Sequence, residues 1–172
     1  MSKEIEDVIN AALEGEVQRN ALELISYLRE NKMNPRKTSK NGWKISSKGC
    51  VVCYIWADTS AGTLAINPFI GEYDHNSLSD DLKEVVWSKK KHGSSCEVCH
   101  VISGDGYNCS YKTKTVFGKD YDDACARSIT FINPTAKEFE CVKKLLELRK
   151  GTIKHGKLLP ASPKNYGYYE EI

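Results

Sequence analysis

Hydrophobic residues in the first thirty positions recur with helical spacing, with one interruption. Apolar side chains fall every three or four residues in two stretches, 5–13 and 17–28, and the positions opposite them are mostly charged. Gly15 lies between the two stretches, and glycine is a poor helix former. The pattern therefore predicts two amphipathic helices that each bury one face.

The period changes from helical spacing to alternation at Trp43. Apolar and polar residues alternate over 43–47, and a β-branched and aromatic run follows at 50–57. A second run of this kind covers 63–70. The three segments predict an antiparallel meander. The polar segment before them, 34–42, begins with Asn-Pro and is predicted to be a loop.

Two more helices are predicted in the second half of the chain. An apolar stripe at 78–86 is accompanied by two candidate N-cap serines and ends in three lysines, which suit the dipole of a helix C-terminus. Asn133 followed by Pro134 has the form of a helix start. The apolar stripe beyond this pair stops at Gly151.

Short strands are predicted at 113–117 and 128–132, on either side of a turn-rich segment at 118–123. Residues 92–112, which precede the first of these strands, show no apolar period. Together these elements predict an α+β fold, in which N-terminal and C-terminal helices pack on an antiparallel sheet and an irregular loop is inserted.

Length and composition support one folded domain. The chain has 172 residues, of which 40% are hydrophobic and 28% charged, and this is enough for a single buried core. We expect the domain to cover residues 1–151, with an irregular insertion at 92–125 and a peripheral tail at 152–172.

Charge and hydropathy narrow the class of protein further. The chain has no apolar run near the roughly 18–20 residues that a membrane helix needs. Its N-terminus has neither the basic start nor the apolar stretch of a secretory signal, so we expect a cytoplasmic protein without a membrane partner. Its 25 Lys and Arg against 23 Asp and Glu give a net charge of +2, which provides no general electrostatic reason to favour nucleic acid.

Four of the seven cysteines have the spacing of a metal site. Cys96 and Cys99 are separated by two residues, and Cys109 and Cys125 follow farther along the chain. A tight turn directs the first two thiolates at one ion, and later cysteines complete the tetrahedral shell of zinc. Structural zinc also offsets the entropy lost when an irregular loop becomes ordered. We therefore predict a zinc site formed by these four cysteines.

Other interpretations of this cluster stay open. His92 or His100 can replace one of the later cysteines as a ligand. Cys96 to His100 matches the haem-attachment pattern, but that attachment normally requires an exported protein. Cys96 and Cys99 could also form a redox dithiol, although such a pair normally lies at a helix N-terminus. The thiols can also be unpaired and simply buried. The other three cysteines are expected to be packing residues: Cys50, Cys53 and Cys141.

Three functional hypotheses follow from these residues. The first is a zinc-stabilised binding or regulatory module with an apolar pocket lined by Trp43, Trp56 and Trp87, although such aromatic residues are usually core. The second is an enzyme that uses an open zinc position or a reactive thiol, without any identified catalytic residue. The third is nucleic-acid binding through lysines and tyrosines in and around the cysteine loop: Lys89, Lys90, Lys91, Tyr107, Tyr111, Lys112 and Lys114.

Several segments resemble a known bacterial family. They are Gly42-Trp-Lys-Ile, Lys48-Gly-Cys-Val-Val-Cys-Tyr-Ile-Trp, Leu64-Ala-Ile-Asn-Pro-Phe and the final helix that ends Leu148-Arg-Lys. Together with the paired N-terminal helices, they look like the YdhG-like, frataxin-related α+β domains of bacteria. The segment from Thr115 to Cys125 is also similar to uncharacterised small bacterial proteins that carry several cysteines.

The resemblance to frataxin-related domains implies iron handling through acidic residues on an early helix. The corresponding residues here are Glu4, Glu6 and Asp7. Thiolates are soft ligands that favour zinc or iron–sulfur clusters over iron held by oxygen ligands. We therefore expect zinc as the structural metal and keep iron handling as an alternative function.

Overall fold

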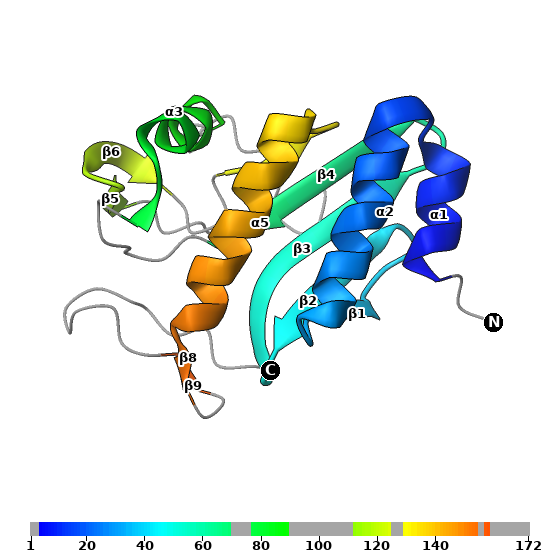
Figure 1. Cartoon of the computed structure of the whole chain (residues 1–172), viewed down its shortest axis with the longest axis horizontal. Coiled ribbons are helices and arrows are strands. Elements are labelled where there is room, and N and C mark those ends of the chain that lie inside the picture. Colours follow the sequence, from blue (N-terminus) through cyan, green and yellow to red (C-terminus); the bar gives the residue numbers. More distant parts are fainter. Residues whose placement is uncertain (1–3, 70–76, 90–111, 125–128, 155–156, 159–172) are drawn as a thin grey trace.

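The computed structural model is an α+β protein in which helices lie across one face of an antiparallel sheet (Figure 1). It describes residues 4–69, 77–89, 112–124, 129–154 and 157–158. The predicted fold class is confirmed. The predicted zinc-binding loop falls mostly outside the described residues.

The two predicted N-terminal helices are present. α1 (Ile5–Ala12) and α2 (Gly15–Glu30) follow one another closely, and each turns its apolar stripe inward. Ile9, Leu24 and Leu28 are each at most 1% exposed. The 3.6-residue period of the sequence therefore identified both helices and their buried faces.

Five antiparallel strands form the main sheet. β1 (Asn34–Lys37), β2 (Gly42–Ser47), β3 (Cys50–Asp58) and β4 (Thr63–Pro68) follow one another as a meander, and β7 (Phe131–Ile132) pairs with β4. The meander predicted from residue 43 onward is confirmed. It gains one strand at its start, β1, and β7 completes the sheet at its other edge.

The prediction of a loop over 34–42 is wrong for its first part, which forms β1. Among the described strands it pairs only with β2, and Pro35 lies opposite Ile45. Proline has no amide hydrogen to donate, so it disrupts a central strand. An edge strand tolerates proline because one side of its backbone has no partner strand.

α5 (Ala136–Gly151) begins directly after Thr135, its N-cap. The backbone N of Glu138 donates to Thr135 Oγ1 at 3.4 Å, and the backbone N of Thr135 donates to Glu138 Oε2 at 2.8 Å, which makes a capping box. The predicted helix start at Asn133 and Pro134 is therefore wrong. Asn133 Oδ1 instead accepts a hydrogen bond from the backbone N of Leu64 at 2.7 Å and so ties this segment to the sheet.

The helices α1, α2 and α5 lie side by side across one face of the sheet, which we call the inner face (Figure 1). Alternate strand residues on this face meet the apolar stripes of the helices. Trp43, Ile45, Ile55 and Ile66 are each at most 3% exposed. Burial of such apolar surface, at about 25 cal/mol per Å², is the main force that holds the two layers together.

α3 (Asp80–Ser88) packs against α5 and against a separate hairpin. One of the two predicted serines, Ser79, is its N-cap residue. Trp87 Nε1 donates to the carbonyl oxygen of Val116 at 2.9 Å, and Lys119 Nζ lies 5.2 Å from the centre of the Trp87 ring. Trp87 therefore ties α3 to the hairpin.

The hairpin consists of β5 (Lys112–Val116) and β6 (Lys119–Ala124), so the prediction of a turn over 118–123 holds for Gly118 and is wrong for 119–123. The turn itself has only two residues, Phe117 and Gly118, with φ values of 48° and 83°. Positive φ at both positions is the requirement of a type I′ turn, and glycine meets it without steric strain. Phe117 is 1% exposed, and the burial of its ring offsets the unfavourable φ.

The described chain continues past α5 into a second small hairpin. β8 (Ile153–Lys154) pairs with β9 (Lys157–Leu158). Ile153 is 2% exposed and packs in the main core. The core therefore includes a residue of the predicted tail, whose residues from 159 onward lie outside the described part of the chain.

Phe131 and Ile132 offer a matched pair of substitutions within β7. Phe131 is fully buried on the inner face, whereas Ile132 is 48% exposed. We expect Phe131→Ala to lower the free energy of unfolding by about 3–5 kcal/mol, because it leaves a cavity in the core. Ile132→Ala should lower it by less than about 1 kcal/mol. Urea denaturation measures both values, and equal losses would contradict the assignment of the two faces.

Candidate functional site

The predicted metal ligands lie outside the described residues. This holds for all four cysteines of the proposed set and for both histidines considered as substitutes: His92, Cys96, Cys99, His100, Cys109 and Cys125. The same is true of Lys90, Lys91, Tyr107 and Tyr111. In the described part of the chain, no group of three or more His, Cys, Asp or Glu residues could hold a metal ion. The zinc site therefore stays a prediction.

The three cysteines predicted as packing residues are all in described elements. Cys53 and Cys141 are fully buried, and Cys50 is half-buried against the core. Burial, assisted by the negative charge of Glu138, raises the pKa of Cys141 to about 12, and burial also raises the pKa of the Cys53 thiol. Cys141 Sγ donates to the carbonyl oxygen of Leu82 at 3.7 Å. Both buried thiols therefore stay protonated at physiological pH.

Two of the three carboxylates implied by the frataxin resemblance are held by an arginine. Arg29 Nη2 lies 2.8 Å from Glu6 Oε1 and 3.4 Å from Glu4 Oε2. The hydrogen bond to Glu6 is the main reason that the pKa of Arg29 is raised. Asp7 is exposed on the same helix. The arginine charge beside Glu4 and Glu6 opposes the binding of a cation by this pair.

The three predicted pocket tryptophans are in different places. Trp43 lies opposite Ile55 and is buried under the helices. Trp56 follows Ile55 in the same strand, so its side chain points to the other face of the sheet. Trp87 is half-buried between α3 and the β5–β6 hairpin. The structure therefore does not bring Trp43 and Trp56 together on one face.

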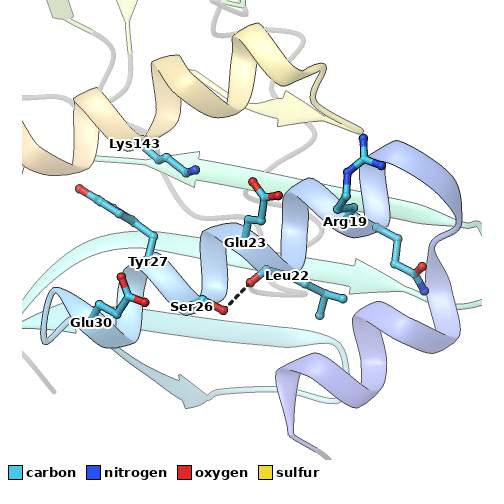
Figure 2. Close-up of a pocket in the computed structure, with 8 residues that line it drawn as sticks. Arg19, Leu22, Glu23, Ser26, Tyr27, Glu30 and Lys143 are labelled. Carbon is cyan, nitrogen blue, oxygen red and sulfur yellow. Dashed lines mark hydrogen bonds between the residues drawn. The ribbon is translucent and has the colours of Figure 1, made fainter.

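A wide groove runs over the solvent side of α2 and α5 (Figure 2). Its volume is about 580 Å³. Polar and charged side chains make most of its lining, and their charges are mixed: Gln18, Arg19, Leu22, Glu23, Ser26, Tyr27, Glu30 and Lys143. A small-molecule site is normally more enclosed and more apolar than this.

Tyr27 lies toward one end of this groove, and Lys143 lies near it on α5 (Figure 2). The Tyr27 hydroxyl donates to Glu147 Oε1 at 3.2 Å, and Lys143 Nζ lies 5.9 Å from the centre of the Tyr27 ring. Burial, followed by the charge of Glu147, raises the pKa of Tyr27 to about 12. The phenol is therefore neutral at physiological pH and acts as a link between α2 and α5.

The face of the sheet opposite the helices, which we call the outer face, carries two rows of cross-strand neighbours. The first row, from β1 to β4, is Arg36, Lys44, Tyr54 and Asn67. The second row, from β2 to β7, is Gly42, Trp56, Ala65 and Ile132. We call these eight residues the outer-face patch.

The patch combines aromatic, aliphatic and cationic side chains. Tyr54 and Trp56 are half-buried neighbours on the central strand, and Lys44 lies directly opposite Tyr54. Arg36 and Ile132 are exposed, and Ile132 is the only exposed large hydrophobic residue in the described part of the chain. The described helices α1, α2 and α5 all lie on the inner face. These three helices therefore do not cover the patch, although Asn67 within it is only 3% exposed.

Asn67 closes the first row of the patch. Its Nδ2 donates to the carbonyl oxygen of Ile129 at 2.9 Å and to Thr130 Oγ1 at 3.0 Å, and its side chain is buried. At the same end, the ring of Phe69 lies 5.8 Å from that of Tyr54, tilted by 45°. These contacts fix the edge of the patch and support the Tyr54 ring.

Sequence reasoning identified Trp56 as a candidate but missed Tyr54, Lys44 and Arg36. The available signal was the alternation of the strand: Tyr54 and Trp56 are two residues apart, and side chains two residues apart share a face. Arg36 could not be found in this way, because its segment was taken for a loop. Its place in the patch depends on the register of β1 against β2.

The fold and its surfaces define an α+β protein with helices on the inner face of a sheet and an aromatic, basic patch on the outer face. A scan against protein-family models, a search of curated proteins and a search of solved structures each found no match. The resemblance to frataxin-related domains therefore stays a prediction. Of the helices that the structure describes, none is both long and apolar enough to cross a membrane.

Cysteine labelling tests the assignment of Cys53 and Cys141 as packing residues. With a pKa of about 12, only about one Cys141 in ten thousand is a thiolate at pH 8, and the folded protein also blocks access to it. We expect iodoacetamide to leave both residues unmodified in the folded chain and to modify both in denaturant, as read by peptide mass spectrometry. Equal modification in the two states would show that these thiols are not buried.

Proposed function

We propose that the chain is a small cytoplasmic binding module that uses the outer-face patch as its binding surface and is stabilised by zinc in the cysteine loop. The observation that carries the proposal is the two-sided sheet. Its inner face is covered by helices, whereas its outer face presents Tyr54 and Trp56 beside Arg36 and Lys44. Neither Tyr54 nor Trp56 belongs to the hydrophobic core cluster.

The chemistry of the patch favours binding over catalysis. Its eight residues comprise two cations, two aromatic rings, two aliphatic side chains, one buried amide and one glycine. They include no carboxylate, imidazole or thiol. Such groups are the commonest general acids, bases and nucleophiles, although Lys and Tyr side chains can also serve in these roles. Rings and cations on a rigid strand can instead hold a ligand through stacking and charge.

The proposed zinc has a structural role. The spacing of Cys96, Cys99, Cys109 and Cys125 suits a four-thiolate site, and a site closed by four protein ligands has no open position for substrate. Zinc bound in this way adds free energy to the folding of a loop that has little apolar sequence of its own. A zinc enzyme would need three protein ligands and a bound water.

Metal analysis of the purified protein tests the zinc proposal. We expect about one zinc per chain, with four sulfur ligands in X-ray absorption. Three protein ligands and one oxygen would support an enzyme instead, and absence of metal would contradict the proposal.

Two cysteine substitutions provide a matched comparison within the chain. Cys96→Ser should lower the zinc content and the melting temperature strongly, because the site loses a ligand. Cys141→Ser should leave the zinc content unchanged and lower the melting temperature less, because Cys141 is a packing residue whose thiol makes one contact with Leu82 O. Equal zinc contents and equal melting temperatures for the two variants would count against the proposed ligand set.

A further inference from the structure

The first hairpin of the sheet and the turns beside it concentrate positive charge. Residues 31–57 contain six of the chain's 25 Lys and Arg and none of its 23 Asp and Glu. The rest of the chain therefore has a net negative charge, although the whole chain is at +2. Because β1 lies at the edge of the sheet (Figure 1), we call the six side chains the basic edge: Lys32, Arg36, Lys37, Lys40, Lys44 and Lys48.

The basic edge differs from many helical cations in its partners. At or within the helices, several Lys and Arg side chains make salt bridges with acids: Arg29, Lys83, Lys89, Lys137 and Lys144. Among the described residues, no acid makes a salt bridge with a member of the basic edge. Ion pairs within the described structure therefore do not neutralise this charge.

Two members of the basic edge have weaker contacts. Lys37 Nζ lies 5.7 Å from the centre of the Trp43 ring. The pKa of Asp58 is lowered mainly by hydrogen bonds from Ser60 and to a smaller extent by the charge of Lys40. The other members have neither an ion pair nor a ring contact in the described part of the chain, and we call them the four unpaired cations: Lys32, Arg36, Lys44 and Lys48. Lys44 is half-buried, and the other three are exposed.

Folding alone does not favour cations at these four positions. Arg36 lies directly opposite Lys44, and like charges that face each other across two strands are destabilising. Lys32 and Lys48 have φ values of 58° and 50°, in the left-handed region where glycine and asparagine are more favourable than lysine. Residues that violate the local preferences of a fold in this way are typical of functional sites.

The four unpaired cations lie at two levels along β1. Lys32 precedes the strand, and Lys48 lies in the turn between β2 and β3, which is at the same end because β2 runs antiparallel to β1. Arg36 and Lys44 face each other farther along the strand, two residues beyond Asn34. Two strand residues span about 7 Å, so the charges are spread over at least this length. A ligand with closely repeated negative charges complements such an edge.

We infer that the basic edge binds the phosphate backbone of a nucleic-acid duplex without reading its bases. A duplex carries about one negative charge per 1.7 Å of its axis, and Lys and Arg neutralise phosphates whatever the sequence. Trp43 is buried and Tyr54 and Trp56 are half-buried, so no nearby ring is exposed for stacking with the bases of a single strand. The inference goes beyond the proposed function, because the basic edge shares only Arg36 and Lys44 with the outer-face patch.

Two other anionic partners fit the basic edge less well. In the described part of the chain, the only exposed large hydrophobic residue is Ile132 on β7, at the opposite edge of the sheet, so the basic edge has no such residue to insert into a membrane. An acidic peptide would add a strand to β1. The backbone N of Thr38 donates to Gly42 O at 2.9 Å, so by alternation Pro35 faces outward, where it has no amide to donate.

The affinity and its salt dependence follow from the four unpaired cations. Four phosphate contacts give a slope of about −3.6 when log K for a DNA duplex is plotted against log salt concentration. Binding without base readout should have a Kd of about 1–100 μM at physiological salt. By the same relation, loss of one contact should weaken binding about fivefold at that salt concentration.

The test is a titration of the full chain into fluorescently labelled DNA and RNA duplexes, followed by anisotropy at about 50–200 mM salt. We expect both duplexes to bind with similar affinity, and the separated strands to bind more weakly. No duplex binding, or stronger binding of single strands, would overturn the inference. Binding of phosphatidylserine vesicles without binding of duplexes would identify a membrane as the partner and would also overturn it.

A pair of double variants separates local charge from total charge. Lys32→Asn with Lys48→Asn removes two charges from the basic edge, and Arg19→Gln with Lys143→Gln removes two from the groove over α2 and α5. The first pair should halve the salt slope and weaken duplex binding, and the second should change neither. The first pair should not lower the melting temperature, because asparagine tolerates positive φ better than lysine. Equal effects of the two pairs on binding would overturn the inference.

Lys44→Glu tests whether the facing cations serve binding at the expense of stability. It places an acid opposite Arg36, so the melting temperature should rise or stay unchanged while duplex binding falls by more than about tenfold. Lys44→Gln, which removes the charge without reversing it, should weaken binding about fivefold. Unchanged duplex binding by Lys44→Glu would contradict the inference.

Trp56→Ala separates this inference from the proposed function. Trp56 belongs to the outer-face patch and not to the basic edge, so the variant should leave duplex binding unchanged. If it weakens duplex binding as much as the Lys32 and Lys48 pair does, the ligand lies on the outer face and the inference is wrong. If duplex binding is retained while Trp56 proves to be covered in the free protein, the proposed function fails and the inference stands.

Discussion

The two-residue alternation of β2, β3 and β4 is the constraint on which the rest of the structure depends. It directs Trp43, Ile45, Ile55 and Ile66 to the inner face, where α1, α2 and α5 cover them. The same alternation directs the intervening residues to the outer face. The apolar stripes of these helices pack on the inner face, whereas Lys44, Tyr54 and Trp56 lie on the outer face. The proposed function assigns ligand binding to these outer-face residues.

Much of the fold could be predicted from periodicity. The 3.6-residue period identified α1 and α2, and alternation identified the meander from residue 43 onward. The wrong predictions concern segments whose secondary structure is set by tertiary contacts. Pro35 belongs to a strand because that strand is at the edge of the sheet, and the charged strand β6 depends on a two-residue turn with Phe117 at positive φ. The start of α5 is set by the Thr135 capping box, which competes with the Asn133-Pro134 signal in sequence.

Less of the candidate site could be predicted. Cysteine spacing indicates a metal site without reference to the fold, and it remains a prediction because those residues lie outside the described part of the chain. The outer-face patch depends on the register of neighbouring strands, which brings Arg36 and Lys44 beside Tyr54 from separate segments. No local pattern encodes that pairing. For the carboxylates of the early helix, the residues themselves are evident from the sequence but their pairing is not. Only the structure shows that Arg29 pairs with both Glu4 and Glu6.

Hydroxyl-radical footprinting of the free protein tests most directly the central claim that helices cover the inner face of the sheet while Trp56 and Ile132 on the outer face are accessible. Mass spectrometry measures the oxidation of each residue. Trp43 serves as the buried control for Trp56, and Phe131 as the buried control for its neighbour Ile132. The account predicts rapid oxidation of Trp56 and Ile132 and strong protection of Trp43 and Phe131, which are each at most 3% exposed. Protection of Trp56 and Ile132 to the same degree as Trp43 and Phe131 would show that the outer face is covered, and would contradict the account.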